Sequence, residues 1–356
     1  MAHVSVTFNP VSIGHGFSFF LSEDAVWCCG NDDCGALGLG KDIKKTFGKL
    51  YRVTPLSNIT FVSCGQGHTL FLDNEGTAWG CGWNAYGQLG MGAVDLNYPV
   101  LIPGVPKFQV MHTSYNHSIF LDFEGTPWVC GWNDDGQLGL RDVSRQFLVQ
   151  RISNLPKIQG ICAGNRESTF VDVEGGVWIT KRNQPIFKIE DLPAIKFASN
   201  NERHALFLDY SGSVWGRGEN GCGELGLGDC ISRASSEKVL SSEVFTAIST
   251  GERHSLFLAE NGQVYGCGSN KNYQLGLTSL ACTANLMLIP DLPPIAIICA
   301  GTQQSVFVDV DGGCWACGAN NEKQLTNIGT KIPTKIELPP LKFRAKTHSK
   351  SARNVF

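Results

Sequence analysis

Residues 82–90 read Gly-Trp-Asn-Ala-Tyr-Gly-Gln-Leu-Gly, and residues 131–139 read Gly-Trp-Asn-Asp-Asp-Gly-Gln-Leu-Gly. Glycine and asparagine tolerate a positive φ, so this segment can make a sharp turn. The leucine supplies one apolar side chain in each copy. We therefore expect each copy to form a tight turn that leads into the outer strand of a small sheet. Weaker copies of the same text begin at Gly30, Gly218, Gly268 and Gly318.

The turn belongs to a larger repeat, which is marked by an aromatic residue that closes a short strand. Consecutive aromatics are separated by 52, 49, 50, 37, 50 and 50 residues. Most are preceded by a loop with glycine and often histidine, an apolar run such as residues 70–73, and a glycine-containing turn such as Asn74-Glu75-Gly76. Short runs joined by such turns are typical of β-hairpins, and one repeat supplies about four strands. The seven aromatics are Trp27, Trp79, Trp128, Trp178, Trp215, Tyr265 and Trp315.

Seven repeats of this kind predict an all-β fold, a seven-bladed β-propeller. A single four-stranded sheet cannot bury both of its faces, so the copies must pack on one another and close. We expect strands from the two termini to close the propeller, because apolar and polar side chains alternate in residues 4–8 and 341–346. The predicted organisation is a propeller over residues 1–340, followed by a C-terminal closing strand and basic tail over residues 341–356.

The fourth copy is shorter than the others. Only 37 residues separate Trp178 from Trp215, and Ile179-Thr180-Lys181-Arg182-Asn183 replaces the glycine-rich turn. We expect this blade to have a shortened outer hairpin.

Composition and charge restrict the class of partner. The chain has 356 residues and a net charge of −3, without the basic excess of proteins that track nucleic-acid phosphates. It contains no apolar run of about 18 residues. Its N-terminus has no basic segment followed by an apolar run, as a secretory signal would. We therefore expect a monomer in the cytoplasm or nucleus that binds neither a membrane nor nucleic acid.

The repeat resembles that of the regulator of chromosome condensation family. The resemblance rests on the period near 50, the Gly-x-x-His-Ser/Thr loop and the Gly-x-Asn-x-x-Gly-Gln-Leu-Gly turn, and it covers about residues 14–340. It implies a seven-bladed propeller. Members of that family include a nucleotide-exchange factor for the GTPase Ran, ubiquitin-ligase modules, a ciliary GTPase-regulator module and a plant ultraviolet-B photoreceptor. The fold alone does not choose among these functions.

The positions that these relatives use hold different residues here. In the exchange factor, important acidic residues lie immediately before the histidine, and one blade carries a wedge-like insertion. None of the corresponding residues of this chain is acidic, and no repeat spacing exceeds 52. The photoreceptor's tryptophans, two places before the histidine, are also replaced. The first set is Gly67, Asn116, Arg203 and Arg253, with Arg166 and Gln303 where the histidine is missing, and the second is Gln66, Tyr115, Glu202 and Glu252.

Arginine and glutamate recur in these loops in successive repeats. Loops on a rigid scaffold often carry recognition residues, and arginine is favoured at protein interfaces. We predict that the loops form a polar rim that binds a protein partner. Alternatively, each glutamate pairs with an arginine of the neighbouring blade and only holds the propeller together. The candidate partner-binding residues are Arg166, Glu167, Glu202, Arg203, Glu252, Arg253, Tyr115 and Asn116.

The repeated histidines and cysteines are predicted to be structural. Equivalent positions in successive blades favour a hydrogen bond that holds each loop, since metal ligands would have to converge. The cysteines two residues after the aromatic are predicted to be small buried side chains between blades. No nucleophile–base pair or metal cluster stands outside the repeat, so we expect no catalytic residue, metal or cofactor. The histidines are His68, His117, His204 and His254.

Two functions follow from these observations. The first is a non-enzymatic scaffold or regulator that binds proteins through the Arg/Glu rim. The second, motivated by the family resemblance, is a guanine-nucleotide exchange factor for a small GTPase of the Ran or Rho type.

Overall fold

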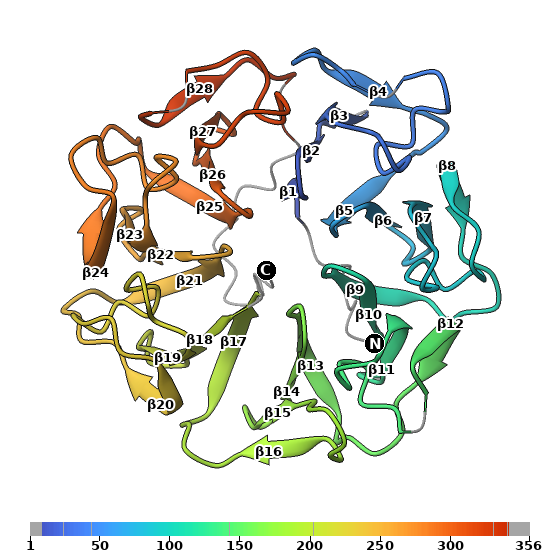
Figure 1. Ribbon diagram of the computed structural model, residues 1–356, viewed down its shortest axis with the longest axis horizontal. Helices are drawn as coiled ribbons and strands as arrows, with labels where there is room; N and C mark the ends of the chain where they lie inside the picture. The colour runs from blue at the N-terminus through green and yellow to red at the C-terminus, as the bar shows by residue number, and fades with distance from the viewer. Residues whose placement is uncertain are drawn as a thin grey trace. The chain divides into compact units, whose positions relative to one another are not determined.

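The computed structural model describes residues 9–23, 25–43, 45–141, 143–201, 203–329, 331–339 and 341. In these residues 28 strands form seven four-stranded antiparallel sheets, which we number as blades 1 to 7 (Figure 1). Each sheet consists of four strands that are consecutive in the sequence. The chain divides into two compact units, residues 1–190 with 322–324 and residues 191–321 with 325–356.

The first unit contains four blades, whose first strands contact one another in sequence order. Blade 1 comprises β1 (Val11–Ile13), β2 (Phe17–Leu21), β3 (Val26–Gly30) and β4 (Tyr51–Val53). Blade 2 comprises β5 (Ile59–Cys64), β6 (His68–Asp73), β7 (Ala78–Gly82) and β8 (Leu96–Leu101). Blade 3 comprises β9 (Phe108–Thr113), β10 (His117–Asp122), β11 (Pro127–Trp132) and β12 (Arg145–Arg151). Blade 4 comprises β13 (Ile158–Ala163), β14 (Ser168–Asp172), β15 (Val177–Ile179) and β16 (Phe187–Ile189).

The second unit contains three blades of the same topology. Blade 5 comprises β17 (Ile195–Asn200), β18 (His204–Asp209), β19 (Val214–Gly218) and β20 (Arg233–Lys238). Blade 6 comprises β21 (Phe245–Thr250), β22 (His254–Ala259), β23 (Val264–Ser269) and β24 (Cys282–Leu288). Blade 7 comprises β25 (Ile295–Ala300), β26 (Gln304–Asp309), β27 (Cys314–Gly318) and β28 (Thr334–Ile336).

Blades 1 and 7 lie at the two ends of the described chain. Blade 1 takes its four strands from residues 11–53 and blade 7 takes its four from residues 295–336. The short run Val11–Ile13, which the repeat pattern did not mark, forms the first strand of blade 1. The proposed closing segments, residues 4–8 and 342–346, lie outside the described residues. The boundary between propeller and tail stays a prediction.

The repeated aromatic has the same cross-strand partner in every blade, where the third strand pairs with the second. In every blade a fully buried phenylalanine of the second strand lies opposite the repeated aromatic of the third strand. Cross-strand aromatic pairs of this kind stabilise a sheet. The aromatics thus mark one strand of each blade, but each is the second residue of its strand and does not close it, so the predicted position was wrong. The pairs are Phe20–Trp27, Phe71–Trp79, Phe120–Trp128, Phe170–Trp178, Phe207–Trp215, Phe257–Tyr265 and Phe307–Trp315.

Neighbouring blades within each unit bury one another's faces. One apolar cluster runs from Phe19 of blade 1 to Phe71 of blade 2, whose ring centroids lie 5.3 Å apart in an edge-to-face arrangement. Another cluster runs from Leu256 of blade 6 to Phe307 of blade 7. Within a unit, neighbouring sheets thus cover each other's apolar faces.

The Gly-x-Asn-x-x-Gly-Gln-Leu-Gly segment forms the expected turn. Asn84 Oδ1 accepts a hydrogen bond from the Leu89 amide over 2.9 Å, and Asn84 Nδ2 donates to the carbonyls of Gly92 and Val94. One asparagine therefore fixes both the turn and the chain that returns toward β8. Gly82 has a φ of 103°, and a Cβ there would lie 2.4 Å from the Gly67 carbonyl oxygen, so only glycine fits. The fourth blade lacks this turn, and only residues 180–186 separate β15 from β16, against residues 83–95 between β7 and β8, which confirms the expected shortening.

The histidines connect consecutive blades through a contact that we call the interblade latch. His68 Nε2 of blade 2 lies 3.0 Å from Ser118 Oγ of blade 3, and this hydroxyl donates to the Gln88 carbonyl of blade 2 over 2.7 Å. Because the serine proton is used in that bond, Nε2 must be the donor to Ser118 Oγ. The other latches join His117 to Ser168 (3.1 Å), His204 to Ser255 (2.8 Å) and His254 to Ser305 (3.1 Å).

The repeated cysteines contact the same carbonyls. Cys130 Sγ donates to the Gln88 carbonyl over 3.3 Å, and Cys29 Sγ donates to the Gln324 carbonyl over 3.0 Å. Both thiols are fully buried, which confirms their predicted place between blades. Equivalent bonds join Cys81 to Ala36, Cys267 to Glu224 and Cys317 to Gln274.

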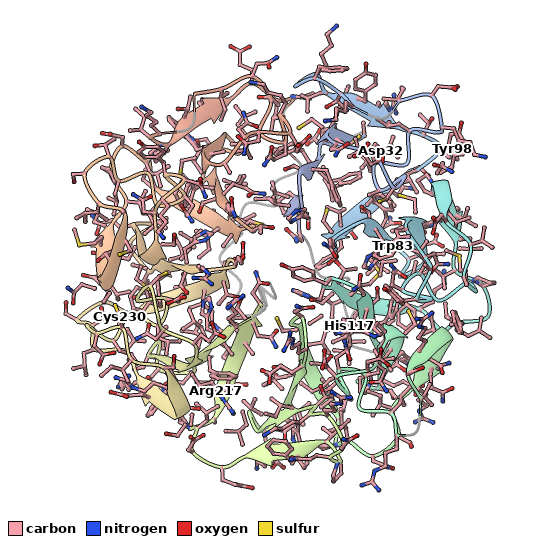
Figure 2. The ribbon with its side chains drawn as sticks, in the orientation of Figure 1. Asp32, Trp83, Tyr98, His117, Arg217 and Cys230 are labelled. Carbon is pink, nitrogen blue, oxygen red and sulfur yellow. The ribbon has the colours of Figure 1, made fainter. Side chains whose placement is uncertain are left out.

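One carboxyl group stands where the other turns have an amide. Asp32 occupies the position of Asn84 in the turn of blade 1 and is 4% exposed (Figure 2). Its Oδ1 accepts a hydrogen bond from the Leu37 amide over 2.6 Å, and its Oδ2 is buried without a hydrogen-bond partner among the described residues. Burial raises the pKa of Asp32 to about 7, with a smaller contribution from the charge of Asp33, although the Leu37 hydrogen bond opposes the shift.

We expect the Asp32→Asn variant to be more stable than the wild type at pH 8, by about 4 kcal/mol. The folded-state pKa lies above that of the unfolded chain. The protonated carboxyl therefore makes its full contribution to the free energy of unfolding below about pH 4, and this contribution is lost as the pH rises through about 7. Urea unfolding at several pH values between 4 and 8 measures the difference. Asp42→Asn, at an exposed position, is the control, and an Asp32→Asn advantage that does not change with pH would contradict the expectation.

The latch histidines have the opposite pH dependence. Burial lowers the pKa of His254 to about 3, so the folded protein does not bind the proton that the unfolded chain takes up below about pH 6.5. Gln304 occupies the same place in blade 7, so His254→Gln is a matched replacement. Between pH 6.5 and pH 5 the wild type should lose about 2 kcal/mol more stability than His254→Gln. The unfolding free energy measured in urea at both pH values tests this, and parallel losses in the two proteins would exclude it.

Candidate protein-binding loops

The loop between the first two strands of a blade is closed by its own backbone. The Gly65 amide donates to the His68 carbonyl over 2.8 Å, and the Gly251 amide donates to the His254 carbonyl over the same distance. The residue before the histidine also accepts a hydrogen bond from the turn, as the Gly67 carbonyl does from the Trp83 amide over 2.7 Å. In the blades of His68, His117, His204 and His254, loop and turn therefore form one layer, with the histidine buried beneath it.

The predicted residues of the first unit lie in this layer. Tyr115 and Asn116 are half-buried, and the Asn116 carbonyl accepts a hydrogen bond from the Trp132 amide over 2.9 Å. The side chain of Arg166 is 72% exposed, and its Nε lies 3.9 Å from Asp135 Oδ2 of the preceding blade. Glu167 is half-buried and takes the place of the latch histidine in blade 4.

In the second unit the two arginines contact one turn. Arg203 Nη1 lies 3.0 Å from Glu219 Oε2, and Arg253 Nη1 lies 3.9 Å from Cys222 Sγ. Arg253 is exposed and Glu252 is half-buried, whereas Glu202 lies outside the described residues. Arg203, like Arg166 of the first unit, thus forms an ion pair with an acid of a motif turn. The structure brings Arg203 and Arg253 together at residues 219–222.

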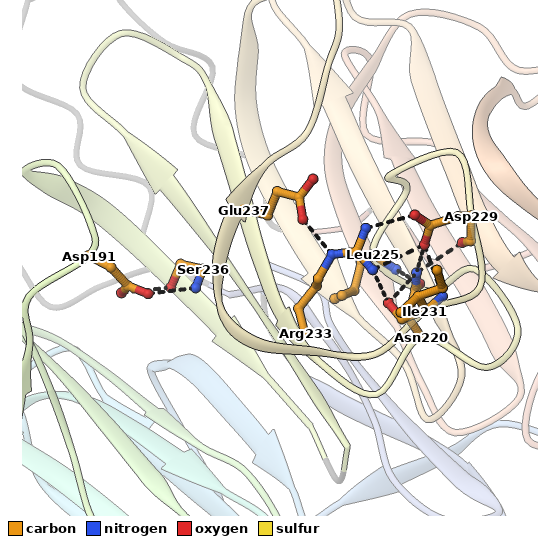
Figure 3. Close-up of polar contacts among 8 residues, drawn as sticks. All are labelled: Asp191, Asn220, Leu225, Asp229, Ile231, Arg233, Ser236 and Glu237. Atoms are coloured by element: carbon orange, nitrogen blue, oxygen red, sulfur yellow. Dashed lines mark hydrogen bonds and ion pairs between the residues drawn. The ribbon is translucent and has the colours of Figure 1, made fainter.

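A network of charges holds this turn of blade 5 (Figure 3). Asn220 Nδ2 donates to the Asp229 carbonyl over 2.9 Å, and Arg233 Nη2 lies 2.7 Å from Asp229 Oδ2. The Nε of Arg233 also bonds Glu237, and its hydrogen bonds hold the pKa of Asp229 below its usual range. The Arg233 side chain, 17% exposed, thus makes its ion pairs within blade 5. Through Asp229 and Asn220 it holds the turn that carries Glu219 and Cys222.

The thiols and imidazoles beneath the layer are held in their neutral forms. Burial raises the pKa of the Cys130 and Cys267 thiols and lowers the pKa of His68 and His117 to about 3. In the described ranges no three His, Cys, Asp or Glu side chains are placed to hold a metal ion. Over the same ranges we find no helix with the length and hydropathy needed to cross a bilayer.

Three rings of blades 2 and 3 form a feature that the sequence reasoning missed. The ring centroids of Trp83 and Tyr86 lie 5.1 Å apart, and those of Tyr86 and Trp132 lie 5.9 Å apart in a stacked arrangement. We call Trp83, Tyr86 and Trp132 the aromatic platform. Both tryptophans were predicted only as parts of the turn. The signal in the sequence was that both occupy the same position of consecutive copies, beside an asparagine that the turn needs.

Models of known families match the chain in its repeats. A model described as the regulator of chromosome condensation (RCC1) repeat matches residues 75–121, 124–171 and 261–308, and a second model of the same description matches residues 59–88 and 245–274.

Two curated relatives match over about a quarter of the chain. The human RCC1-like G exchanging factor-like protein is 32% identical over 91 residues, which is 24% of this chain and 20% of that protein. The human probable E3 ubiquitin-protein ligase HERC4 is 31% identical over 88 residues, which is 24% of this chain and 8% of that protein. The matched segment thus spans at most about a fifth of these relatives.

Solved structures resemble the chain over most of its length. Yeast RCC1 (Prp20) in complex with Kap60 has a TM-score of 0.81 at 21% identity and covers 89% of this chain and 85% of that one. Human WBSCR16 has a TM-score of 0.56 at 17% identity, with 94% and 82% covered. This likeness confirms the predicted fold class, an all-β seven-bladed propeller. The chain thus contains repeats of the regulator of chromosome condensation (RCC1) type.

Proposed function

We propose that the chain is a non-catalytic propeller that binds and regulates a protein partner through its loop-and-turn layer. The observation that carries this proposal is the meeting of Arg203 and Arg253 at one internally braced turn of blade 5. Recognition residues on a rigid scaffold lose little conformational entropy on binding. The arginines present planar guanidinium groups, which suit carboxylates of a partner.

The pairing of Arg203 with Glu219 fits such a role. Both side chains are partly exposed, 32% and 54%, so their ion pair contributes little to stability. A partner carboxylate can replace Glu219 at a small cost. Arg253, which contacts the same turn, supplies a second positive charge. We therefore propose that the partner presents an acidic segment to these two arginines.

Charge reversal at both arginines tests the proposal. The Arg203→Glu/Arg253→Glu variant should bind the partner that wild type captures, identified by proximity labelling and then purified, at least about tenfold more weakly. Titration calorimetry measures the dissociation constants. Because the two side chains are not in the core, the free energy of unfolding should stay within about 0.5 kcal/mol of wild type.

The matched control is Arg141→Glu/Arg151→Glu, which makes the same change in net charge at two exposed positions of the first unit. This control variant should bind with the affinity of the wild type. Equal affinity of the Arg203→Glu/Arg253→Glu variant and the wild type would contradict the proposal that these arginines bind the partner.

A second candidate is regulation of a small GTPase, up to nucleotide exchange on a Ran-type or Rho-type protein. Support comes from the family and from two relatives, one named an RCC1-like G exchanging factor-like protein, the other the yeast Prp20p, whose structure was described with its binding to Gsp1p and histones. The residues before the histidines are not acidic in this chain, so exchange here would have to use other side chains of the layer.

Release of a fluorescent GDP analogue from a panel of Ran-type and Rho-type GTPases tests this candidate. With micromolar propeller, at least one GTPase should release the nucleotide about tenfold faster, equivalent to a barrier lowered by about 1.4 kcal/mol. The Arg203→Glu/Arg253→Glu variant shows whether the same turn is used. Unchanged release across the panel would exclude exchange and leave the binding proposal in place.

A further inference from the structure

The aromatic platform lies in the loop-and-turn layer of the first unit, whereas the arginines Arg203 and Arg253 belong to the second. Trp83 and Tyr86 come from the turn after β7, Trp132 is the last residue of β11, and all three are partly exposed. Figure 2 places Trp83 over blade 2. Gly67 lies beside Trp83, and a Cβ at Gly67 would sit 3.5 Å from the Trp83 Cβ, so this glycine adds no side chain over the tryptophan.

Acidic side chains outnumber basic ones in the turns around the platform. Over equal lengths, the turns at residues 30–43, 82–95 and 131–144 contain Asp32, Asp33, Asp42, Asp95, Asp134, Asp135 and Asp142 against Lys41 and Arg141. Asp33, Asp95 and Asp134 are exposed. Two of these acids bond to the platform turns directly: Asp95 accepts a hydrogen bond from the Asn84 amide over 2.7 Å, next to Trp83, and Asp134 accepts one from Trp132 Nε1 over 2.6 Å.

A cationic side chain of the protein already packs on one ring of the platform. The Arg145 guanidinium carbon lies 4.8 Å from the centroid of Tyr86. Arg145 reaches it from β12, where it is the cross-strand partner of Trp132. The platform therefore holds a guanidinium group at cation–π distance, and the tryptophans on either side of Tyr86 are stronger cation–π acceptors.

We propose that the aromatic platform and its flanking aspartates bind an arginine-bearing segment of a partner protein. A guanidinium group stacks on a tryptophan face, and further basic side chains pair with Asp33, Asp95 or Asp134. Partly exposed aromatics with an acidic surround are typical of binding hot spots for basic segments. The proposal deepens the proposed function by naming the partner chemistry of blades 1 to 3, and it does not depend on Arg203 or Arg253.

Direct binding of a fluorescent peptide tests the proposal on the full chain. The probe is a nonapeptide of alternating glycine and arginine, and its neutral counterpart has citrulline for each arginine. Fluorescence anisotropy should give a dissociation constant below about 1 mM for the arginine peptide at low salt. The citrulline peptide should bind at least about tenfold more weakly.

Two sets of variants separate ring recognition from general charge attraction. Trp83→Leu/Trp132→Leu keeps apolar bulk but removes the π faces, and it should weaken binding about tenfold. Asp33→Asn/Asp134→Asn should weaken binding about threefold at low salt, and this effect should disappear in high salt. The controls are Tyr210→Leu, an exposed ring of blade 5, and Glu260→Gln/Asp311→Asn, two exposed acids of the second unit.

Several results would overturn the proposal. These are no binding by the wild type, equal binding of the citrulline peptide, wild-type affinity in a Trp83→Leu/Trp132→Leu protein with an unchanged unfolding midpoint, or an equal loss in Tyr210→Leu. If the leucine variant does not fold, Trp83→Leu alone decides between the same outcomes. Failure here leaves the binding role of Arg203 and Arg253 untouched, because that role is measured with a different variant and a different ligand.

Discussion

The structure depends on one small hydrogen-bonded group, the backbone carbonyl of the turn that receives two donors from the next blade. The Gln88 carbonyl accepts from Ser118 Oγ and Cys130 Sγ, and the His68 imidazole holds the serine from the other side. A buried carbonyl left without donors is costly, so the turn and the following sheet stabilise each other. This constraint explains why histidine, serine, cysteine and the glycine-rich turn recur together along the chain.

The latch also determines what the loops can do. In the described blades that have a latch histidine, the imidazole is buried and the loop backbone is closed on itself, whereas the side chains just before the histidine include exposed ones such as Arg253. The scaffold supplies the same backbone in each blade, and the residues added to it differ between blades. Arg203 and Arg253 meet one turn in blade 5, whereas two tryptophans and a tyrosine share a surface in blades 2 and 3. Binding specificity thus resides in positions that the fold leaves free.

Much of the fold could be predicted because its determinants are local. The spacing from Trp79 to Trp128 reflects a cross-strand register, and the glycines of the turn sequence reflect positive φ angles, so both can be recognised without a structure. The first strand of blade 1 was missed because Val11–Ile13 carries no repeat signature. The partners of Arg203 and Arg166 were missed because they depend on which side chains of different segments meet in space. Trp83 and Trp132 were assigned to the turn, although the turn needs only their neighbours Asn84 and Asn133.

The chain carries its latches in two sets, and this arrangement bears on how it unfolds. His68–Ser118 and His117–Ser168 belong to the first unit, and His204–Ser255 and His254–Ser305 to the second. Between the sets, glutamate stands in the histidine position at 167, alanine in the serine position at 205 and arginine in the cysteine position at 217. In repeat proteins cooperativity passes from neighbour to neighbour. We therefore expect a defect in one latch serine to affect first the neighbouring blade that supplies its histidine.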